Sequence, residues 1–552
     1  MLSGYRGRFK LIYIDPPYNT GESYVYEDRY SVPEPEYLLD TGQVDEQGQA
    51  TSGRVENGGR KHAPWLTMML PRLAVARYLL SRDGAIVVSI DDNEAHHLRV
   101  LLDGLLGERN RLGTFIWEGG RKNDAKFVSE GHDYMFCYAR DKAYLEEMGV
   151  RFRVAKPGAA EILAEVERLR EIHGEDNDAI EAGLAEWYGS LPKGHTVREI
   201  DYYRYVDHRG VFYLGDISSP NTRTNLIYDY KGYSPPEKGW RYERETMERL
   251  DSEERVWFPD SKDKRLQIKR YLHESDGDVP GSVFYRDRRG ASKSLDALLG
   301  EDVFDNPKDV GVLRRLVEAI ATDEGDLVLD FFAGSGTTAE AVWRQEKADG
   351  IGRRWVLVQA PEAVPPESAA SKAGFESVYE IARRRLSLVA DALEKETDGE
   401  AGDFGLRAFE CAESNLVIHP PIVNDGDLSG EEYVQQSIER TKEPAVKPGV
   451  DHDALVWEIL LKGTKLDLSA RVHLHETRGE RIYELRAGDG RELDGRVFVF
   501  PGERMTISLA DELGLVSGDR FFCRSDALDD SASVTIGQRC RLVFVERVPG
   551  AV

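Results

Sequence analysis

The stretch Phe9–Gly21, with the sequence FKLIYIDPPYNTG, constrains the fold more than any other part of the chain. Lys10–Ile14 is a mostly apolar run of β-branched and aromatic residues, which predicts a short buried strand. Two consecutive prolines follow, and because proline has no backbone N–H to donate, the strand ends there and the chain turns outward. The sequence therefore predicts a carboxylate and an aromatic ring at the carboxyl end of a strand, where ligands bind in open α/β sheets.

The residue types after this strand suit one task, which is to hold an exocyclic amino group on a planar base. The Asp15 carboxylate and the Pro16 carbonyl can each accept a hydrogen bond from such a group, while Tyr18 can stack on the ring. A base has to leave the duplex to be held in this way. The alternative is that these residues form only a tight turn after a strand. The predicted catalytic residues are Asp15, Pro16, Pro17 and Tyr18.

A second motif lies more than 300 residues later. Leu327–Asp330 predicts a buried strand, residues 331–338 read FFAGSGTT, and a helix is expected from Ala339. A strand, a glycine turn and a helix let a cofactor approach the backbone closely and meet the N–H groups at the helix N-terminus. Within this turn, Thr337 and Thr338 can cap the helix.

The strand expected at Arg354–Gln359 ends at Gln359. A dinucleotide fold would place an acid there to bind the ribose hydroxyls. Glu362 lies a little further along, so the ribose partner stays open at this point.

Composition sets broad limits. A chain of 552 residues with 41% hydrophobic and 31% charged residues is long enough for two to four domains. It has no signal segment and no apolar run of the roughly 18 residues that would span a bilayer. The four cysteines have no CxxC spacing, so they suggest neither a disulfide framework nor a zinc site. We expect a cytoplasmic protein in a reducing environment, without a metal.

The net charge of −26 counts against DNA binding, although not decisively, because Lys and Arg supply most of the affinity for phosphates. Three explanations would reconcile DNA binding with this acidic net charge. The basic residues cluster on one face, a partner supplies part of the affinity, or the source cell favours acidic proteins. The clearest basic clusters are 262–270 and 286–293, and a solvated loop is the alternative for each. The candidate DNA contacts are Arg121, Lys122, Lys269, Arg270, Arg288 and Arg289.

Three local predictions concern the elements around the motifs. Trp65–Leu80 has helical spacing and should be broken or kinked at Pro71. Residues 91–94 (DDNE) are expected to cap the helix that follows, with a functional site as the alternative. Glu458 and Lys462 are expected to form a surface i, i+4 pair.

The order of the two motifs, DPPYNTG before DFFAGSGTT, resembles that of amino-methyltransferases of the permuted β class. Over nearly the whole chain, the sequence is similar to the modification subunits of type III restriction–modification systems. The matching segments are LIYIDPPYNTG, VSIDDNE, GGRKNDAKF, VFDNPKDVGVLRRLVEAI and VQAPE, together with the C-terminal domain. This resemblance implies an α/β, Rossmann-like AdoMet-dependent methyltransferase sheet with an inserted α+β target-recognition region and a smaller C-terminal α+β domain.

The resemblance also implies functions for individual residues. Asp15 and its three neighbours would act on the amino group, and DPPY rather than SPPY favours adenine N6 over cytosine N4. Asn306, Pro307 and Lys308 would lie beside the methionine end of the cofactor, S-adenosyl-L-methionine. The full set of implied cofactor-binding residues is Asp330, Phe332, Ala333, Gly334, Gly336, Thr337, Lys308 and Gln359.

The implied domains are the catalytic half (1–140), the target-recognition insert (141–295), the AdoMet-binding half (296–395), a linker region (396–450) and a C-terminal domain (451–552). The implied partners are double-stranded DNA, a second copy of the chain, and a separate helicase–nuclease restriction subunit. No membrane is expected to be a partner.

Two departures from the family pattern leave other functions open. Only eight residues precede Phe9 where the family has a longer segment, and DNPKD lacks the usual proline after the lysine. One alternative is therefore a catalytically impaired module for DNA recognition or assembly that retains the methyltransferase fold. Methylation of an RNA or protein amine also fits the motifs, but not the large insert.

Overall fold

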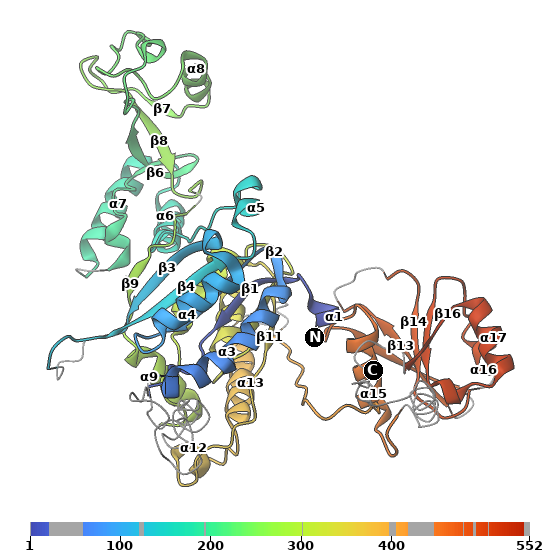
Figure 1. The fold of residues 1–552 in the computed structure, drawn as a ribbon. Helices are drawn as coiled ribbons and strands as arrows, with labels where there is room; N and C mark the ends of the chain where they lie inside the picture. The colour runs from blue at the N-terminus through green and yellow to red at the C-terminus, as the bar shows by residue number, and fades with distance from the viewer. Residues whose placement is uncertain are drawn as a thin grey trace, which may run out of the picture. The chain divides into compact units, whose positions relative to one another are not determined.

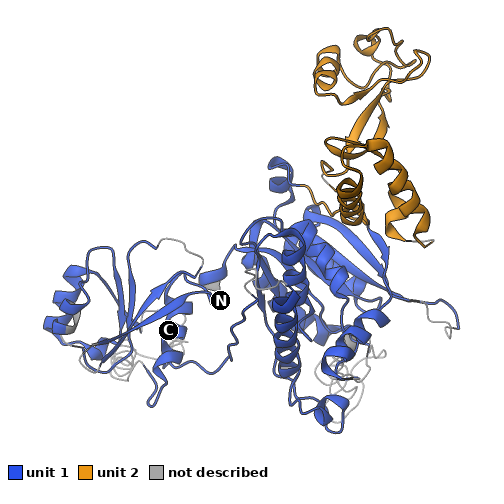
Figure 2. Ribbon diagram, turned by 180° about the vertical axis from the view of Figure 1, so that it is seen from behind, with its two compact units in different colours: residues 1–150, 281–552 blue, residues 151–280 orange. Residues whose placement is uncertain are grey.

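The computed structural model describes residues 2–20, 59–120, 126–192, 195–275, 277–300, 302–396, 404–417, 446–477, 480–488, 493–505 and 507–545. The chain divides into two compact units (Figure 2). Residues 1–150 and 281–552 form the first unit, and residues 151–280 form the second.

A seven-stranded mixed sheet is the centre of the first unit (Figure 1). In spatial order its strands are β11 (Arg354–Leu357), β10 (Leu327–Asp330), β1 (Phe9–Ile14), β2 (Leu80–Ile90), β4 (His132–Ala139), β3 (Arg111–Glu118) and β9 (Val283–Tyr285). From β11 to β2 neighbouring strands are parallel, whereas β4 is antiparallel to both β2 and β3. The α/β, Rossmann-like sheet predicted from the sequence is confirmed.

Strand β1 lies between β10 and β2 in this sheet, and every one of its residues is buried. Parallel strands covered on both faces read as continuous apolar runs, and both LIYI and LVLD follow this pattern. Strand β10 pairs with β1 in parallel, with Ile12 opposite Leu329. As a result, the two segments that carry the sequence motifs leave the sheet side by side, at the same edge.

Both faces of the sheet are covered at β11. Successive side chains of a strand point to opposite faces, and those of β11 pack against two different cores. Val356 and Val358 pack against the core that contains Trp65, whereas Trp355 packs against the core that contains Trp343. The main helices of this unit are α3 (Gly59–Leu79), α4 (Ala95–Leu102), α10 (Val310–Ile320), α11 (Thr337–Asp349) and α13 (Val378–Glu396).

Helix α3 continues through both Pro64 and Pro71, so a break at Pro71 is wrong, while a kink there stays a prediction. A proline inside a helix costs about 3 kcal/mol. The side chains of Trp65, Met69 and Leu73 are almost fully buried against the sheet. Burying each of them stabilises the fold by roughly 1.5–3 kcal/mol, which is enough to offset the cost of the proline.

The second unit contains a four-stranded sheet with the order β5 (Tyr205–Asp207), β6 (Gly210–Asp216), β8 (Gln267–Tyr271) and β7 (Val256–Trp257). Its helices are α6 (Ala159–His173), α7 (Asn177–Ser190) and α8 (Arg244–Ser252). The insert was expected at 141–295, and this unit is shorter at both ends. Helix α5 (Lys142–Glu147), strand β9 and helix α9 (Arg289–Leu299) all lie in the first unit.

The C-terminal part of the first unit has its own five-stranded sheet, formed by β12 (Arg471–Thr477), β13 (Glu480–Arg486), β14 (Val497–Phe500), β15 (Arg520–Cys523) and β16 (Arg541–Phe544). Its helices are α15 (His452–Gly463), α16 (Ile507–Glu512) and α17 (Asp530–Arg539). The predicted Glu458–Lys462 pair is present at 2.6 Å. Among the described residues, no helix is both long and apolar enough to cross a membrane.

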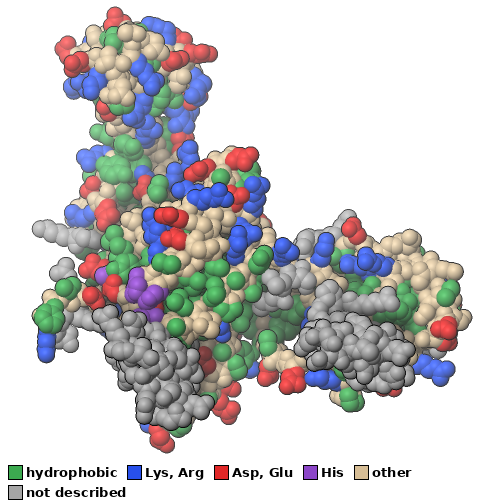
Figure 3. All heavy atoms as spheres, in the orientation of Figure 1, with side chains coloured by type: hydrophobic (Ala, Val, Ile, Leu, Met, Phe, Trp, Pro, Cys, Tyr) green, Lys and Arg blue, Asp and Glu red, His purple; other side chains and the backbone are tan. Residues whose placement is uncertain are grey.

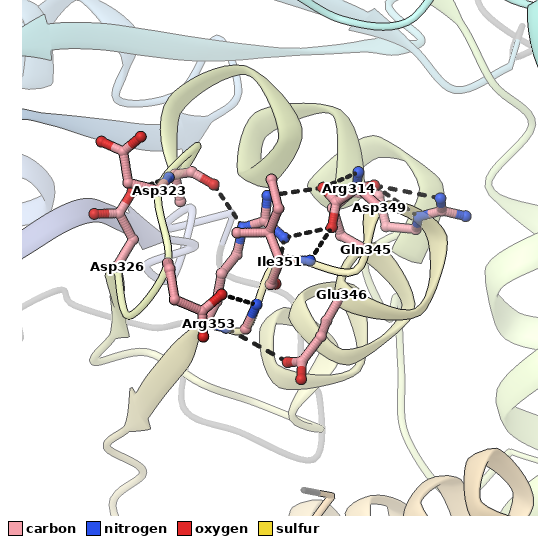
Figure 4. Close-up of polar contacts among 11 residues, drawn as sticks. Arg314, Asp323, Asp326, Gln345, Glu346, Asp349, Ile351 and Arg353 are labelled. Carbon is pink, nitrogen blue, oxygen red and sulfur yellow. Dashed lines mark hydrogen bonds and ion pairs between the residues drawn. The ribbon is translucent and has the colours of Figure 1, made fainter. Parts of the chain in front are cut away.

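A buried arginine joins the end of α11 to the end of α10 (Figure 4). Arg353 donates to both carboxylate oxygens of Asp349, at 2.9 and 2.8 Å, and to the carbonyls of Ala321 and Ile351. Burial alone would raise the pKa of Asp349, but hydrogen bonds from Arg353 and Gln345 lower it. This cluster fixes the connection that leads into β11.

Replacing this arginine should therefore destabilise the first unit. We expect Arg353→Met to lower the free energy of unfolding by about 3 kcal/mol, because it removes the buried guanidinium that pairs with Asp349 and donates to two carbonyls. Lys347→Met is a control on α11, the helix that carries Asp349, since it removes an exposed pair with Glu396 worth under about 1 kcal/mol. Urea unfolding measures both, and equal losses would contradict the prediction.

Candidate active site

The two sequence motifs line one cavity of about 970 Å³ in the first unit. Asp15, Pro16, Pro17 and Tyr18 line it from the segment after β1. Asp330, Phe332, Ala333, Gly334 and Thr337 line it from the segment after β10, and Asn306, Pro307, Lys308 and Gln359 complete the predicted set. Gly336 is the one predicted cofactor residue that shapes the turn without lining the cavity.

Lys308 connects the DPPY segment to a second carboxylate. Its Nζ donates to the Tyr18 hydroxyl at 2.6 Å and lies 3.1 Å from Asp15 Oδ1 and 3.2 Å from Asp133 Oδ2. The Tyr18 hydroxyl in turn donates to Asp133 at 3.3 Å. The position of this lysine beside the methionine end of the cofactor stays a prediction. In the structure its ammonium lies between two carboxylates at the DPPY end of the cavity.

An aromatic and cationic wall surrounds Asp133, which is almost fully buried. Arg288 donates to Asp133 at 2.7 Å, and its guanidinium lies 5.1 Å from the ring centroid of Trp117. The Trp117 indole donates to the carbonyl of Arg286. These contacts hold the carboxylate in one position opposite the DPPY segment.

The two carboxylates differ in their protonation behaviour. Burial raises the pKa of Asp15, with Lys308 opposing and Asp133 adding to the rise. Burial alone would also raise the pKa of Asp133, but Lys308 and Arg288 lower it overall. For Lys308 itself, burial favours a lower pKa, and the two carboxylates outweigh it and raise the pKa. Asp133 therefore carries a fixed charge, whereas Asp15 is the group whose protonation changes more readily.

The glycine turn after β10 needs backbone conformations that favour glycine. Gly334 has φ +51° and Gly336 has φ +83°, both in the left-handed region. Gly336 is the N-cap of α11, and its helix has no side-chain cap, so the prediction that Thr337 and Thr338 cap it is wrong. Their hydroxyls are engaged elsewhere: Thr338 donates to Asp330 at 2.6 Å, and Thr337 accepts from Arg385 at 2.8 Å.

A buried arginine on α13 supports this turn from behind. Arg385 donates to the hydroxyls of Ser335 and Thr337 and to one oxygen of Glu340. Arg385 and Glu340 are both almost fully buried, so the charges are compensated within the pair. These contacts of Arg385 therefore fix the shape of the turn.

Asp330 and Gln359 contact the backbone of the same turn. Asp330 accepts from the Phe332 N–H at 3.0 Å, and Gln359 Oε1 accepts from the Gly334 N–H at 2.7 Å. Burial raises the pKa of Asp330 to about 7, against hydrogen bonds from Thr338 and Phe332 that lower it. Glu362, left open as a ribose partner, also lines the cavity.

This arrangement agrees with the comparison to protein families. The family model N6_N4_Mtase, described as DNA methylase, matches residues 9–353, which is well over half of the chain and includes both motifs. The chain belongs to this DNA methylase family. The boundary at residue 353 includes Lys308 and Asp133, so the whole carboxylate–lysine cluster lies within the methylase match.

Three relatives within this methylase group are similar over most of the chain. The type III restriction–modification enzyme EcoP15I Mod subunit of Escherichia coli is 30% identical over 407 residues, covering 70% of this chain and 60% of its own. The EcoPI Mod subunit of Escherichia phage P1 is 30% identical over 403 residues, with the same coverage. The type II methyltransferase M.KpnI of Klebsiella pneumoniae is 26% identical over 405 residues, covering 69% of this chain and 82% of its own. The chain thus spans about 60% of the length of the type III relatives.

Solved structures with this methylase architecture are more distant. The PvuII DNA methyltransferase (cytosine-N4-specific) is 12% identical with a TM-score of 0.29, covering 70% of this chain and 88% of its own. The M1.HpyAVI–SAM complex is 9% identical with a TM-score of 0.25, covering 69% and 89%. Scores this low carry no argument about function.

The predicted DNA contacts of the methylase belong to both units, and they stay predictions. Arg288 lines the cavity, and Arg289 beside it is 84% exposed and paired with Asp287. Lys269 and Arg270 lie on β8 in the second unit, where Lys269 pairs with Asp207 at 2.8 Å and Arg270 donates to the Tyr242 hydroxyl. Arg121 and Lys122 lie outside the described residues.

Sequence patterns did not single out several residues that the fold brings to the site. Asp133, Trp117 and Arg385 are distant in sequence from the groups they contact, so no local spacing links them. The prediction that residues 91–94 cap the next helix is wrong for Glu94, whose side chain makes no cap bond although it is the N-cap residue. Its buried carboxylate accepts from Asn19 at 2.7 Å instead.

The pKa of Asp330 leads to a prediction about stability. Because its pKa is raised from 3.8 to about 7 in the folded protein, the folded state binds more protons than the unfolded state in this range. The wild type should therefore lose stability relative to Asp330→Asn as the pH rises from about 4 to about 7.

Urea unfolding midpoints at several pH values across this range test the prediction. Asp141→Ala is a control of opposite sign, because hydrogen bonds from the Tyr144 N–H and Arg82 lower the pKa of Asp141. That carboxylate stabilises the fold above the unfolded pKa, and its contribution is lost as the pH falls. Parallel pH dependences for wild type and Asp330→Asn would show that this carboxyl has an ordinary pKa.

Proposed function

We propose that this protein transfers a methyl group from S-adenosyl-L-methionine to adenine N6 in DNA. The observation that carries the proposal is that the DPPY segment and the glycine turn line one cavity at the ends of adjacent parallel strands. Methyl transfer needs the attacking nitrogen and the methyl donor held in line, and alignment of this kind supplies much of the rate acceleration.

The glycine turn fits the cofactor. The cavity of about 970 Å³ has room for both a cofactor and a base. Phe332 offers a ring, and the backbone at Gly334 can be approached closely, while Gln359 and Glu362 supply polar groups at the end of β11. When bound, the sulfonium of the cofactor supplies an electrophilic methyl group.

The DPPY segment would hold the base. Asp15 accepts a hydrogen bond from the amino group and so directs the nitrogen lone pair away from the ring system. Tyr18 stacks on the base, with its hydroxyl fixed by Lys308 and Asp133. A base reaches this cavity only after it leaves the duplex. Once the nitrogen has formed its new bond, it carries an extra proton, which Asp15 Oδ can accept because burial raises its pKa.

We further propose that the chain acts as the modification subunit of a type III-like restriction–modification system. The relatives that are Mod subunits of such enzymes support this proposal. The preference for adenine rests on the DPPY sequence. Residues 151–280 would read the DNA target, the chain would act as a homodimer, and a separate restriction subunit would be its partner.

Removing the Asp15 carboxylate tests the assignment. We expect Asp15→Ala to lower the rate of methyl transfer roughly a hundredfold or more. The amino group of the base loses its hydrogen-bond acceptor and the carboxylate that takes up its proton after transfer. Binding of AdoMet should remain largely intact, since the glycine turn is unchanged. The measurements are tritium transfer from labelled AdoMet to mixed-sequence DNA and calorimetric titration of AdoMet.

Digestion of the labelled DNA identifies the product. Label on N6-methyladenine supports the proposal, whereas label on N4-methylcytosine or none from the wild type contradicts it. Asp141→Ala, which removes a carboxylate that does not line the cavity, is the control and should keep full activity. Equal loss of AdoMet binding and transfer in Asp15→Ala would refute the separate functions of the two motifs.

Lys308 sets the ionisation of Asp15 and therefore the pH dependence. Lys308 opposes the rise in the pKa of Asp15, so Lys308→Gln should raise that pKa further. If ionised Asp15 holds the amino group, the acid limb of kcat/KM shifts to higher pH in this variant. Rates across about pH 5 to 9 measure the shift, with Lys347→Gln as the control. An acid limb at the wild-type position would contradict this function of Lys308.

A further inference from the structure

A group of histidines lies beside the active site and outside the residues that line its cavity. His62 lies on α3 and His97 on α4, and Glu94 lies in the turn between β2 and α4. Histidine side chains gather in one patch on the face shown in Figure 3. The rings of His62 and His97 have centroids 4.3 Å apart.

We propose that His62, Glu94 and His97 bind a divalent first-row transition metal ion, with Zn²⁺ as the best fit. The possible ligand atoms of all three residues lie within 4.8 Å of one another. No other group of three or more His, Cys, Asp or Glu residues within the described ranges meets this geometry. The site is separate from the proposed methyl-transfer chemistry and does not depend on it.

The distances are close to those of a bound ion. His62 Nδ1 lies 2.7 Å from Glu94 Oε1, and His97 Nδ1 lies 3.0 Å from Glu94 Oε2. In a tetrahedral zinc site with bonds of about 2.0–2.2 Å, neighbouring ligand atoms are about 3.3 Å apart. Small rotations of the partly exposed His62 and His97 side chains would lengthen these distances to about 3.3 Å.

Glu94 has the environment of a carboxylate that needs a cation. Its side chain is fully buried, and in the described part of the chain its ion-pair partners are these two histidines, with no Lys or Arg. A buried carboxylate is costly unless it is paired or binds a metal. A neutral imidazole is the form of histidine that binds metals.

The donor set selects the class of ion. Two imidazole nitrogens and one carboxylate oxygen suit Zn²⁺, Co²⁺ or Ni²⁺, whereas Mg²⁺ and Ca²⁺ prefer oxygen ligands throughout. Three protein ligands leave a fourth position for water. His96 is exposed and its ring centroid lies 3.8 Å from that of His97, yet it is not part of the ligand group.

The ion would also act on the catalytic segment. Asn19 directly follows Tyr18 and donates to Glu94 Oε1 at 2.7 Å. A metal bound by Glu94 would therefore tie the segment after β1 to α3 and α4. We infer a structural ion that fixes the position of the DPPY segment.

Metal titration of the full chain tests the site. After dialysis against a chelator, Zn²⁺ is titrated by calorimetry and Co²⁺ by visible absorption. We expect one ion per chain and the Co²⁺ absorption bands of a four-coordinate nitrogen–oxygen site. His62→Ala and His97→Ala should each weaken Zn²⁺ binding by at least about tenfold, while His96→Ala, the matched control, should change it less than about twofold.

Glu94→Gln provides a second test that leaves both histidine side chains in place. It keeps the shape of the side chain but removes its charge, so Zn²⁺ should raise the thermal midpoint of the wild type and not that of the variant. The absence of saturable binding, or equal affinities in the His96 and His97 variants, would overturn the proposal. In that case the cluster is a hydrogen-bonded acid–imidazole group without an ion.

Discussion

The parallel pairing of β1 with β10 is the interaction on which the rest of the site depends. The pairing register sets Ile12 opposite Leu329, so that Asp15 and Asp330 emerge at one edge of the sheet although more than 300 residues separate them. At this position the chain turns from β1 to β2 on one side and from β10 to β11 on the other. Such a reversal of strand order leaves a crevice at the strand ends, and the cavity lies there.

Charge compensation in this cavity is the second constraint. Asp15 and Asp133 both face Lys308, and a half-buried and a buried carboxylate so close together would be costly without the ammonium between them. Arg288 holds Asp133 from the other side, so Asp133 stays ionised and Asp15 is free to respond to a bound base. The proposed metal site follows the same principle, since Glu94 is a buried carboxylate that lacks an Arg or Lys partner within the described ranges.

Local rules failed where tertiary contacts offered a better partner. Helix α3 passes through Pro71 because its apolar face is buried against the sheet. Thr338 does not cap α11, since its hydroxyl donates to the buried Asp330. In each case the sequence pattern was consistent with a local function, and only the fold shows which competing contact is formed.

The sequence by itself determined the buried strands, the proline-ended segment from Asp15 to Tyr18, and the glycine turn from Gly334 to Gly336. These features depend on apolar runs and on backbone restrictions of neighbouring residues, which a linear pattern records. Tertiary structure alone decided that Lys308 lies between Asp15 and Asp133, that Arg385 supports the turn, and that Asn19 and His62 contact Glu94. Such contacts join segments far apart in the chain, and their partners are fixed only when strand register and helix packing bring them together.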